Sequence, residues 1–173
     1  MPVSIDLVPY PADEVDTLEA WIAAPHVVRW WKLSWTATVI DALRAGDPAQ
    51  SGIRSWRVDL DGQPIGYAQD YDVTQGDSPW IGVDDIGPGT RGMDLLIGVP
   101  DLINRKHGRA IIRALATRLF TEHGASRLVS SPHPDNWPAI IAFKRAGFRE
   151  RGRRQFPGGP AMILTAAKAV WRA

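Results

Sequence analysis

The stretch that decides the fold of this chain reads Arg91-Gly92-Met93-Asp94-Leu95-Leu96-Ile97-Gly98 and, after a short spacer, Arg105-Lys106-His107-Gly108-Arg109-Ala110. The first part predicts an apolar strand. The second predicts a basic loop that opens an amphipathic helix reaching Phe120. The N-terminus of a helix carries unpaired N–H groups and partial positive charge, so it favours an anion, above all a phosphate. Gly108 would let the main chain approach such a ligand closely.

The rest of the chain alternates between strand and helix patterns. Asp61-Gly62 between two apolar runs predicts a hairpin, and Asn136 predicts the cap of a helix that ends before Gly147. The expected strands are 3–8, 53–60, 64–71, 93–97, 127–130, 148–155 and 161–167, and the expected helices are 12–24 (ended by Pro25), 38–45, 107–123 and 136–146. Residues 72–90 read as a long polar loop of the kind that is often functional.

Length and composition predict one domain over residues 1–173, with a substantial core. The chain has no cysteine, which excludes disulfides, thiolate catalysis and Cys-ligated zinc. No secretory signal or membrane-spanning run is visible, so we expect a cytoplasmic protein without a membrane partner. We also expect no metal, because no metal-ligand spacing links His26, His107, His123 and His133.

A net charge of +1 hides a strong division between the two parts of the chain. Residues 1–103 carry 16 acidic and 6 basic side chains, whereas residues 104–173 carry 3 acidic and 14 basic ones. This asymmetry fits an anionic cofactor held by the second part and a cationic substrate held by the first. Mutual attraction of the two parts explains it equally well. The acidic part argues against a nucleic-acid partner.

Two motifs on these elements resemble the GNAT (Gcn5-related) N-acetyltransferases. One is the Arg-x-x-Gly-x-Ala loop of residues 105–110, and the other is the segment 134–148, with Asn136 at a helix start and a closing Ala-Gly-Phe. The resemblance implies an α/β acyl-CoA N-acyltransferase fold, in which helices flank a mixed, mostly antiparallel central sheet. It also implies acetyl-coenzyme A as the cofactor. The sequence leaves the oligomeric state open between a monomer and a homodimer.

Further blocks resemble the aminoglycoside 6′-N-acetyltransferases, which act in antibiotic resistance. They are His26–Trp31, Pro64–Gln69, Gly89–Asp94 and Gly159–Ala161. A related branch acetylates hydroxylysine-type amines in siderophore synthesis and often has His at the position of Asp94. The expected activity is therefore acetyl transfer to the 6′-amine of an aminoglycoside. Another metabolite amine as acceptor and a non-catalytic acyl-coenzyme-A-binding domain stay open as alternatives.

Acetyl transfer needs a group that takes the proton of the incoming ammonium. The resemblance places the Asp94 carboxylate there. Acidic side chains at 70, 72, 77, 84 and 85 would attract a polycation, and tryptophan faces would stack on its sugar rings. We expect one of Trp30 and Trp31 in the core and the other, with Trp80, at the substrate. The residues assigned to the substrate are Trp31, Asp77, Trp80, Asp94, Ser131 and Asp135.

The cofactor would lie along the central strand and on the helix start. The residues assigned to it are Leu95, Leu96, Ile97, Arg105, His107, Gly108, Arg109, Ala110, Asn136 and Phe143. Asn136 would reach the pantetheine arm, or it would only cap its helix. Two positions depart from the family pattern: Phe143 stands where many members have a proton-donating Tyr, and Ser131 stands where aminoglycoside enzymes tend to have Asp.

Overall fold

The computed structural model describes residues 2–76, 78–83 and 85–173. Its strands form one seven-stranded sheet in the order β1-β2-β3-β4-β5-β7-β6. They are β1 (Ile5–Pro9), β2 (Ile53–Leu60), β3 (Gln63–Asp72), β4 (Thr90–Ile97), β5 (Arg127–Ser130), β6 (Arg149–Phe156) and β7 (Gly159–Ala167). β4 and β5 run parallel, whereas β1–β2, β5–β7 and β6–β7 are antiparallel. The predicted mixed α/β fold is confirmed.

The helices are α1 (Val15–Ala23), α2 (Pro25–Val28), α3 (Ala37–Arg44), α4 (His107–Glu122) and α5 (Trp137–Ala146). Short 3₁₀ turns occupy Ala12–Glu14, Leu33–Trp35, Pro48–Ser51, Pro100–Leu102 and Lys168–Val170. In the described ranges no helix is both long and apolar enough to cross a membrane. The chain groups into two compact units, one of residues 1–70 and 94–107 and the other of residues 71–93 and 108–173.

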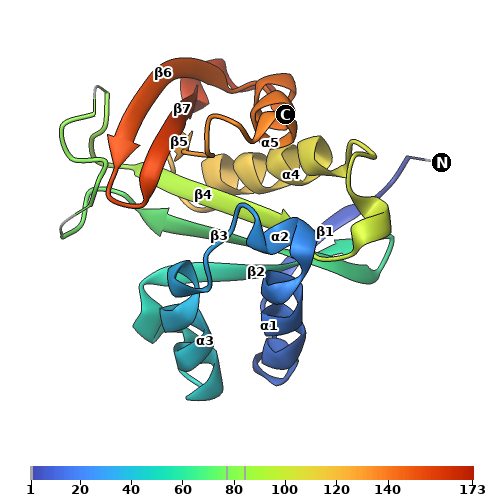
Figure 1. The fold of residues 1–173 in the computed structure, drawn as a ribbon. Helices are drawn as coiled ribbons and strands as arrows, with labels where there is room; N and C mark the ends of the chain where they lie inside the picture. The colour runs from blue at the N-terminus through green and yellow to red at the C-terminus, as the bar shows by residue number, and fades with distance from the viewer. Residues whose placement is uncertain (1, 77, 84) are drawn as a thin grey trace. The chain divides into compact units, whose positions relative to one another are not determined.

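The first unit packs helices against β1, β2 and β3, with α1 and α3 on the same side of β2 in Figure 1. Its core joins the apolar face of α1, carrying Leu18 and Ile22, to the buried rings of Tyr10, Trp31 and Tyr67. The helix predicted over 12–24 is a 3₁₀ turn followed by α1, which ends before Pro25. Pro25 itself opens α2, because a proline fits the first turn of a helix.

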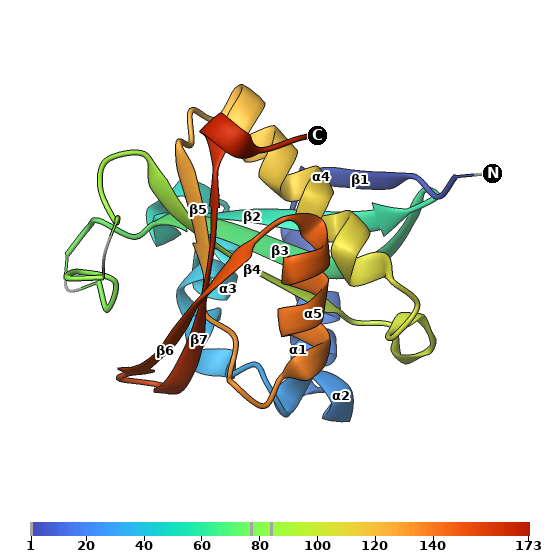
Figure 2. The same cartoon turned by 90° about the horizontal axis from the view of Figure 1, so that it is seen from above.

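The second unit contains α4 and α5, which lie side by side in both views (Figures 1 and 2), and the β6–β7 hairpin. Asn136 caps α5 by accepting the Ala139 N–H at 3.4 Å, as predicted. Gly147 ends that helix with φ of 117°, a left-handed conformation that glycine adopts without strain. β6 closes one end of the sheet, and all of its residues except Phe156 are exposed.

Candidate functional site

Asp94 lies on β4, half-buried, at the end of a short row of polar side chains. Gln69 on β3 donates from Nε2 to Asp94 Oδ2 at 3.1 Å, and Tyr67 donates from its hydroxyl to Gln69 Oε1 at 2.9 Å. Tyr67 and Gln69 are both buried and, two residues apart on one strand, share a face. This arrangement presents a carboxylate whose supporting groups are excluded from water.

The two adjacent tryptophans have opposite environments. Trp31 is buried, donates from Nε1 to Thr36 Oγ1 at 2.7 Å, and packs edge to face on Tyr67 with ring centroids 6.0 Å apart. Trp30 is half-buried, with the Arg29 guanidinium 4.8 Å from its ring centroid. As expected, one of the two tryptophans lies in the core. The buried one is Trp31, however, which had been assigned to the substrate. With its ring enclosed, Trp31 packs on Tyr67 and has no face left for a sugar ring.

Trp80 also takes a core position instead of the expected sugar-stacking one. Its side chain is 2% exposed and packs edge to face on Phe156, in a cluster with Val73, Val129 and Ile163. Sequence reasoning took its polar neighbours as a sign of exposure, but a loop over an open sheet face can bury one large ring.

Some of the acidic side chains expected to attract the substrate are exposed, and one of them is buried. Asp72 and Asp85 are exposed, and Asp77 and Asp84 lie outside the described residues. Asp70, expected at the mouth of the site, belongs to β3 and is fully buried. It accepts a hydrogen bond from Trp56 Nε1 at 2.8 Å, and Arg54 Nη1 lies 3.9 Å away. Asp70 is therefore part of an internal network and cannot attract a substrate at the surface.

The main chain of β4 provides an extended segment beyond its pairing with β5. The parallel register covers Thr90–Gly92 and Arg127–Val129, so Asp94–Ile97 continues past it. The Leu96 carbonyl lies against Gly66 of β3, and carbonyls alternate in direction along a strand, so those of Leu95 and Ile97 point the other way. Ile97 O already contacts His26 Nε2 at 2.8 Å. Of the three predicted residues, Leu95 and Ile97 thus face the side where an added strand would pair.

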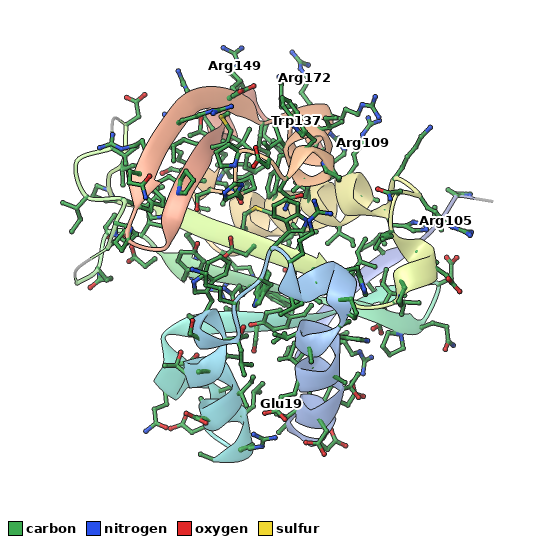
Figure 3. The ribbon with its side chains drawn as sticks, in the orientation of Figure 1. Glu19, Arg105, Arg109, Trp137, Arg149 and Arg172 are labelled. Carbon is green, nitrogen blue, oxygen red and sulfur yellow. The ribbon has the colours of Figure 1, made fainter. Side chains whose placement is uncertain are left out.

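The start of α4 combines a helix N-terminus with clustered cations. Arg105, Lys106 and Arg109 are exposed, the first turn holds no acidic residue, and Figure 3 shows Arg105 and Arg109 extending from the ribbon. Asn104 and Lys106 have φ of 60° and 67°, which turn the chain sharply into the helix. Cations at this end of a helix oppose its dipole. An anion would relieve that opposition.

Gly108 fits such an anion site better than it fits a packing role. A Cβ built on it would meet only Ala142 Cβ, at an ordinary 3.6 Å. The fold therefore gives no reason for glycine here, whereas close approach of a ligand to the backbone does.

The remaining predicted residues lie on or before α5. The side-chain oxygen of Asn136 accepts the capping hydrogen bond, and its amide N–H groups can donate to another partner. Phe143, predicted to meet the cofactor, takes a core position instead: it is 3% exposed and packs edge to face on Phe148, with centroids 5.0 Å apart. Ser131 is half-buried, and Asp135 is exposed with its carboxylate 3.8 Å from His133 Nδ1. Among the described residues, no His, Cys, Asp and Glu cluster could hold a metal ion.

Sequence reasoning assigned no role to Tyr67 and Gln69, although both stand in a block that it singled out for its resemblance. Two polar residues at i and i+2 among apolar ones were the available signal, because both must point to one face of a strand. The hydrogen bond of Gln69 to Asp94 depends on the pairing of β3 with β4, which no local pattern specifies.

These features define a class of protein. The model of the acetyltransferase (GNAT) domain matches residues 10–156, so this chain belongs to the GNAT acetyltransferase family. The predicted resemblance, fold class and enzyme class are thereby confirmed.

The similar proteins narrow the class further. The aminoglycoside N(6′)-acetyltransferase type 1 of Klebsiella pneumoniae is 30% identical over 159 residues, which cover 89% of this chain and 78% of that protein. A solved aminoglycoside acetyltransferase AAC(6′)-Ib with coenzyme A and kanamycin superimposes with a TM-score of 0.84 at 29% identity, covering 96% of both chains. The same enzyme with ribostamycin and coenzyme A gives 0.82 at 28% identity, covering 96% of this chain and 94% of that one.

Proposed function

We propose that this protein transfers the acetyl group of acetyl-coenzyme A to the 6′-amine of an aminoglycoside. The observation that carries the proposal is Asp94, a half-buried carboxylate held by Gln69 on the strand segment that continues past its pairing with β5. The solved structures named above hold coenzyme A together with kanamycin or ribostamycin, which supports both substrates.

Acetyl-coenzyme A, when bound, supplies the activated thioester. The backbone N–H groups at His107–Ala110, with Arg105 and Arg109, would hold its pyrophosphate. The exposed cations of that turn fit this role, and so does Gly108, which packing does not require to be a glycine. Leu95 and Ile97 would pair with the pantetheine amides as a strand partner does. Asn136 would donate to the same arm from the amide N–H groups that its cap does not use.

Asp94 would accept a proton from the substrate ammonium and so leave the nitrogen lone pair free to attack. Phe143 has no proton to give, so water or the departing ammonium proton would neutralise the thiolate. The chain would then accelerate the reaction chiefly by holding amine and thioester in place, an effect that can supply several kcal/mol, about 7 or more in favourable cases. The acidic residues 85 and 72, both exposed, would attract the polycation.

Release of coenzyme A, measured with a thiol reagent, tests the proposal. This chain has no cysteine, so the protein itself gives no background. We expect turnover with an aminoglycoside that carries a 6′-amine and none with a matched one that carries a 6′-hydroxyl. Preference for hydroxylysine or a polyamine would favour a metabolic acceptor. Coenzyme A binding without release by any amine would favour a non-catalytic binding domain.

Gly108→Val should weaken acetyl-coenzyme A binding by at least about tenfold, because a branched side chain would stand between the ligand and the backbone N–H groups. The protein has room near Ala142, so we expect the variant to fold. Calorimetric titration measures the affinity. Ala114→Val, six residues further along α4 at a half-buried position, controls for a β-branched residue in this helix and should bind normally. Equal affinity of both variants would contradict the assignment.

A further inference from the structure

In the row of hydrogen bonds that joins Tyr67, Gln69 and Asp94, each group can donate in only one direction, from Tyr67 toward Asp94. A buried amide can be placed with its oxygen or its nitrogen toward a given neighbour. Here the Asp94 carboxylate accepts and the Tyr67 hydroxyl donates, so Gln69 must turn its Nε2 to the first and its Oε1 to the second. A reversed amide would bring two oxygens together at the carboxylate and leave the hydroxyl without its acceptor.

Tyr67 stays protonated in this position. Burial raises its pKa well above the ordinary value, and electrostatic repulsion from Asp94, Tyr10 and Asp70 acts in the same direction. The hydroxyl is therefore a permanent donor at any pH where the enzyme would work.

The Tyr67 ring has no freedom to carry that hydroxyl elsewhere. Tyr10 packs on it edge to face at 5.7 Å and 72°, and Trp31 does so at 6.0 Å and 83°. The Trp31 ring is in turn tied to Thr36 at 2.7 Å. Aromatic contacts of this kind fix ring orientation as well as burying area. The row thus begins at a rigid aromatic cluster and ends at the carboxylate.

We propose that Tyr67 and Gln69 are positioning residues that hold the Asp94 carboxylate in the one orientation that can accept the ammonium proton. The inference rests on the proposed role of Asp94 and adds to it. A donor fixed at Oδ2 restrains the rotation of the carboxylate, so the range of approach open to the amine is narrowed before the substrate arrives. Small misplacements of a reacting group cost much rate, up to about 10²-fold for roughly 1 Å.

Three variants test the row: Tyr67→Phe, Gln69→Leu and the two combined. Each single change should lower kcat about tenfold and leave acetyl-coenzyme A affinity unchanged, because the cofactor residues are not touched. The double variant should be no slower than Gln69→Leu alone, since both residues act through one link. Losses in kcat that multiply to about a hundredfold would overturn the inference.

Tyr10→Phe is the matched control. Tyr10 is a buried tyrosine of the same cluster, but its hydroxyl donates to the carbonyl of Glu14 at 2.9 Å and not into the row. We expect its kcat to stay within about twofold of the parent, although it loses a hydrogen bond of similar worth. If Tyr67→Phe and Tyr10→Phe reduced kcat equally, the role of Tyr67 would be only structural.

Asp94→Asn separates this inference from the function it rests on. Full activity of Asp94→Asn would remove the proposed proton acceptor itself. A slow Asp94→Asn together with unchanged kcat in Tyr67→Phe and Gln69→Leu would keep the acceptor and refute the positioning row. Thermal unfolding of every variant shows whether a loss of kcat comes from unfolding, and kcat is then compared below the lowest Tm.

Discussion

Replacing Asp94 by asparagine should lower kcat by about 10²-fold or more, the range that a positioned proton acceptor contributes. Asparagine has nearly the same shape, and its oxygen can still accept the Gln69 Nε2–H bond, so β4 should keep its conformation. It cannot take a proton from an ammonium group. Steady-state kinetics at saturating acetyl-coenzyme A measures the effect, and calorimetry should show normal cofactor affinity.

Asp101→Asn is the control for loss of one negative charge in the same part of the chain. Asp101 is exposed on the 3₁₀ turn Pro100–Leu102, which follows β4. We expect its kcat to match that of the parent. Equal kinetics of Asp94→Asn and Asp101→Asn would mean that the Asp94 carboxylate takes no part in the reaction.

Gly66→Ala should destabilise the protein by about 3 kcal/mol or more, at the upper end of what overpacking costs. A Cβ on Gly66 would overlap the carbonyl oxygen of Leu96 and come within 3.2 Å of Ile97 Cα. Both contacts are with backbone, which cannot rotate away as a side chain would. Urea unfolding followed by fluorescence measures the free energy of unfolding, and activity should fall because the displaced segment carries Asp94.

Gly87→Ala provides the comparison. A Cβ on Gly87 would meet no atom within 4 Å, and its φ lies outside the left-handed region. Its free energy of unfolding should stay within about 0.5 kcal/mol of the parent. If Gly66→Ala were as stable as Gly87→Ala, the close approach of β3 and β4 at this point would be wrong.

Features set by neighbours in sequence could be predicted. Asp61 and Gly62 adopt φ of 49° and 81°, as a tight hairpin needs, and the cap at Asn136 forms within four residues. The start of α4 at His107 could be predicted from the basic loop and from the apolar residues that recur at helical spacing after it. In each case the residues that interact are a few positions apart, so the pattern contains the whole interaction.

Features set by pairing between distant segments could not be predicted. Burial of Asp70 depends on an indole from β2, and burial of Trp80 depends on Phe156 at the end of β6. The polar composition of the segment around both residues predicted that they would lie at the surface. The support of Asp94 by Gln69 likewise joins two strands whose register a sequence pattern does not fix.

The exposed strand β6 has a consequence for behaviour at high concentration. It ends the sheet, so its outer backbone groups are a template on which another strand could pair. Arg149, Arg151, Arg153 and Arg154 project from it, and Figure 3 shows Arg149 reaching outward. Like charges on two such edges repel, which disfavours edge-to-edge pairing of two copies through β6. Salt reduces the reach of that repulsion to about 10 Å at 0.1 M, so added salt should weaken this protection of the β6 edge.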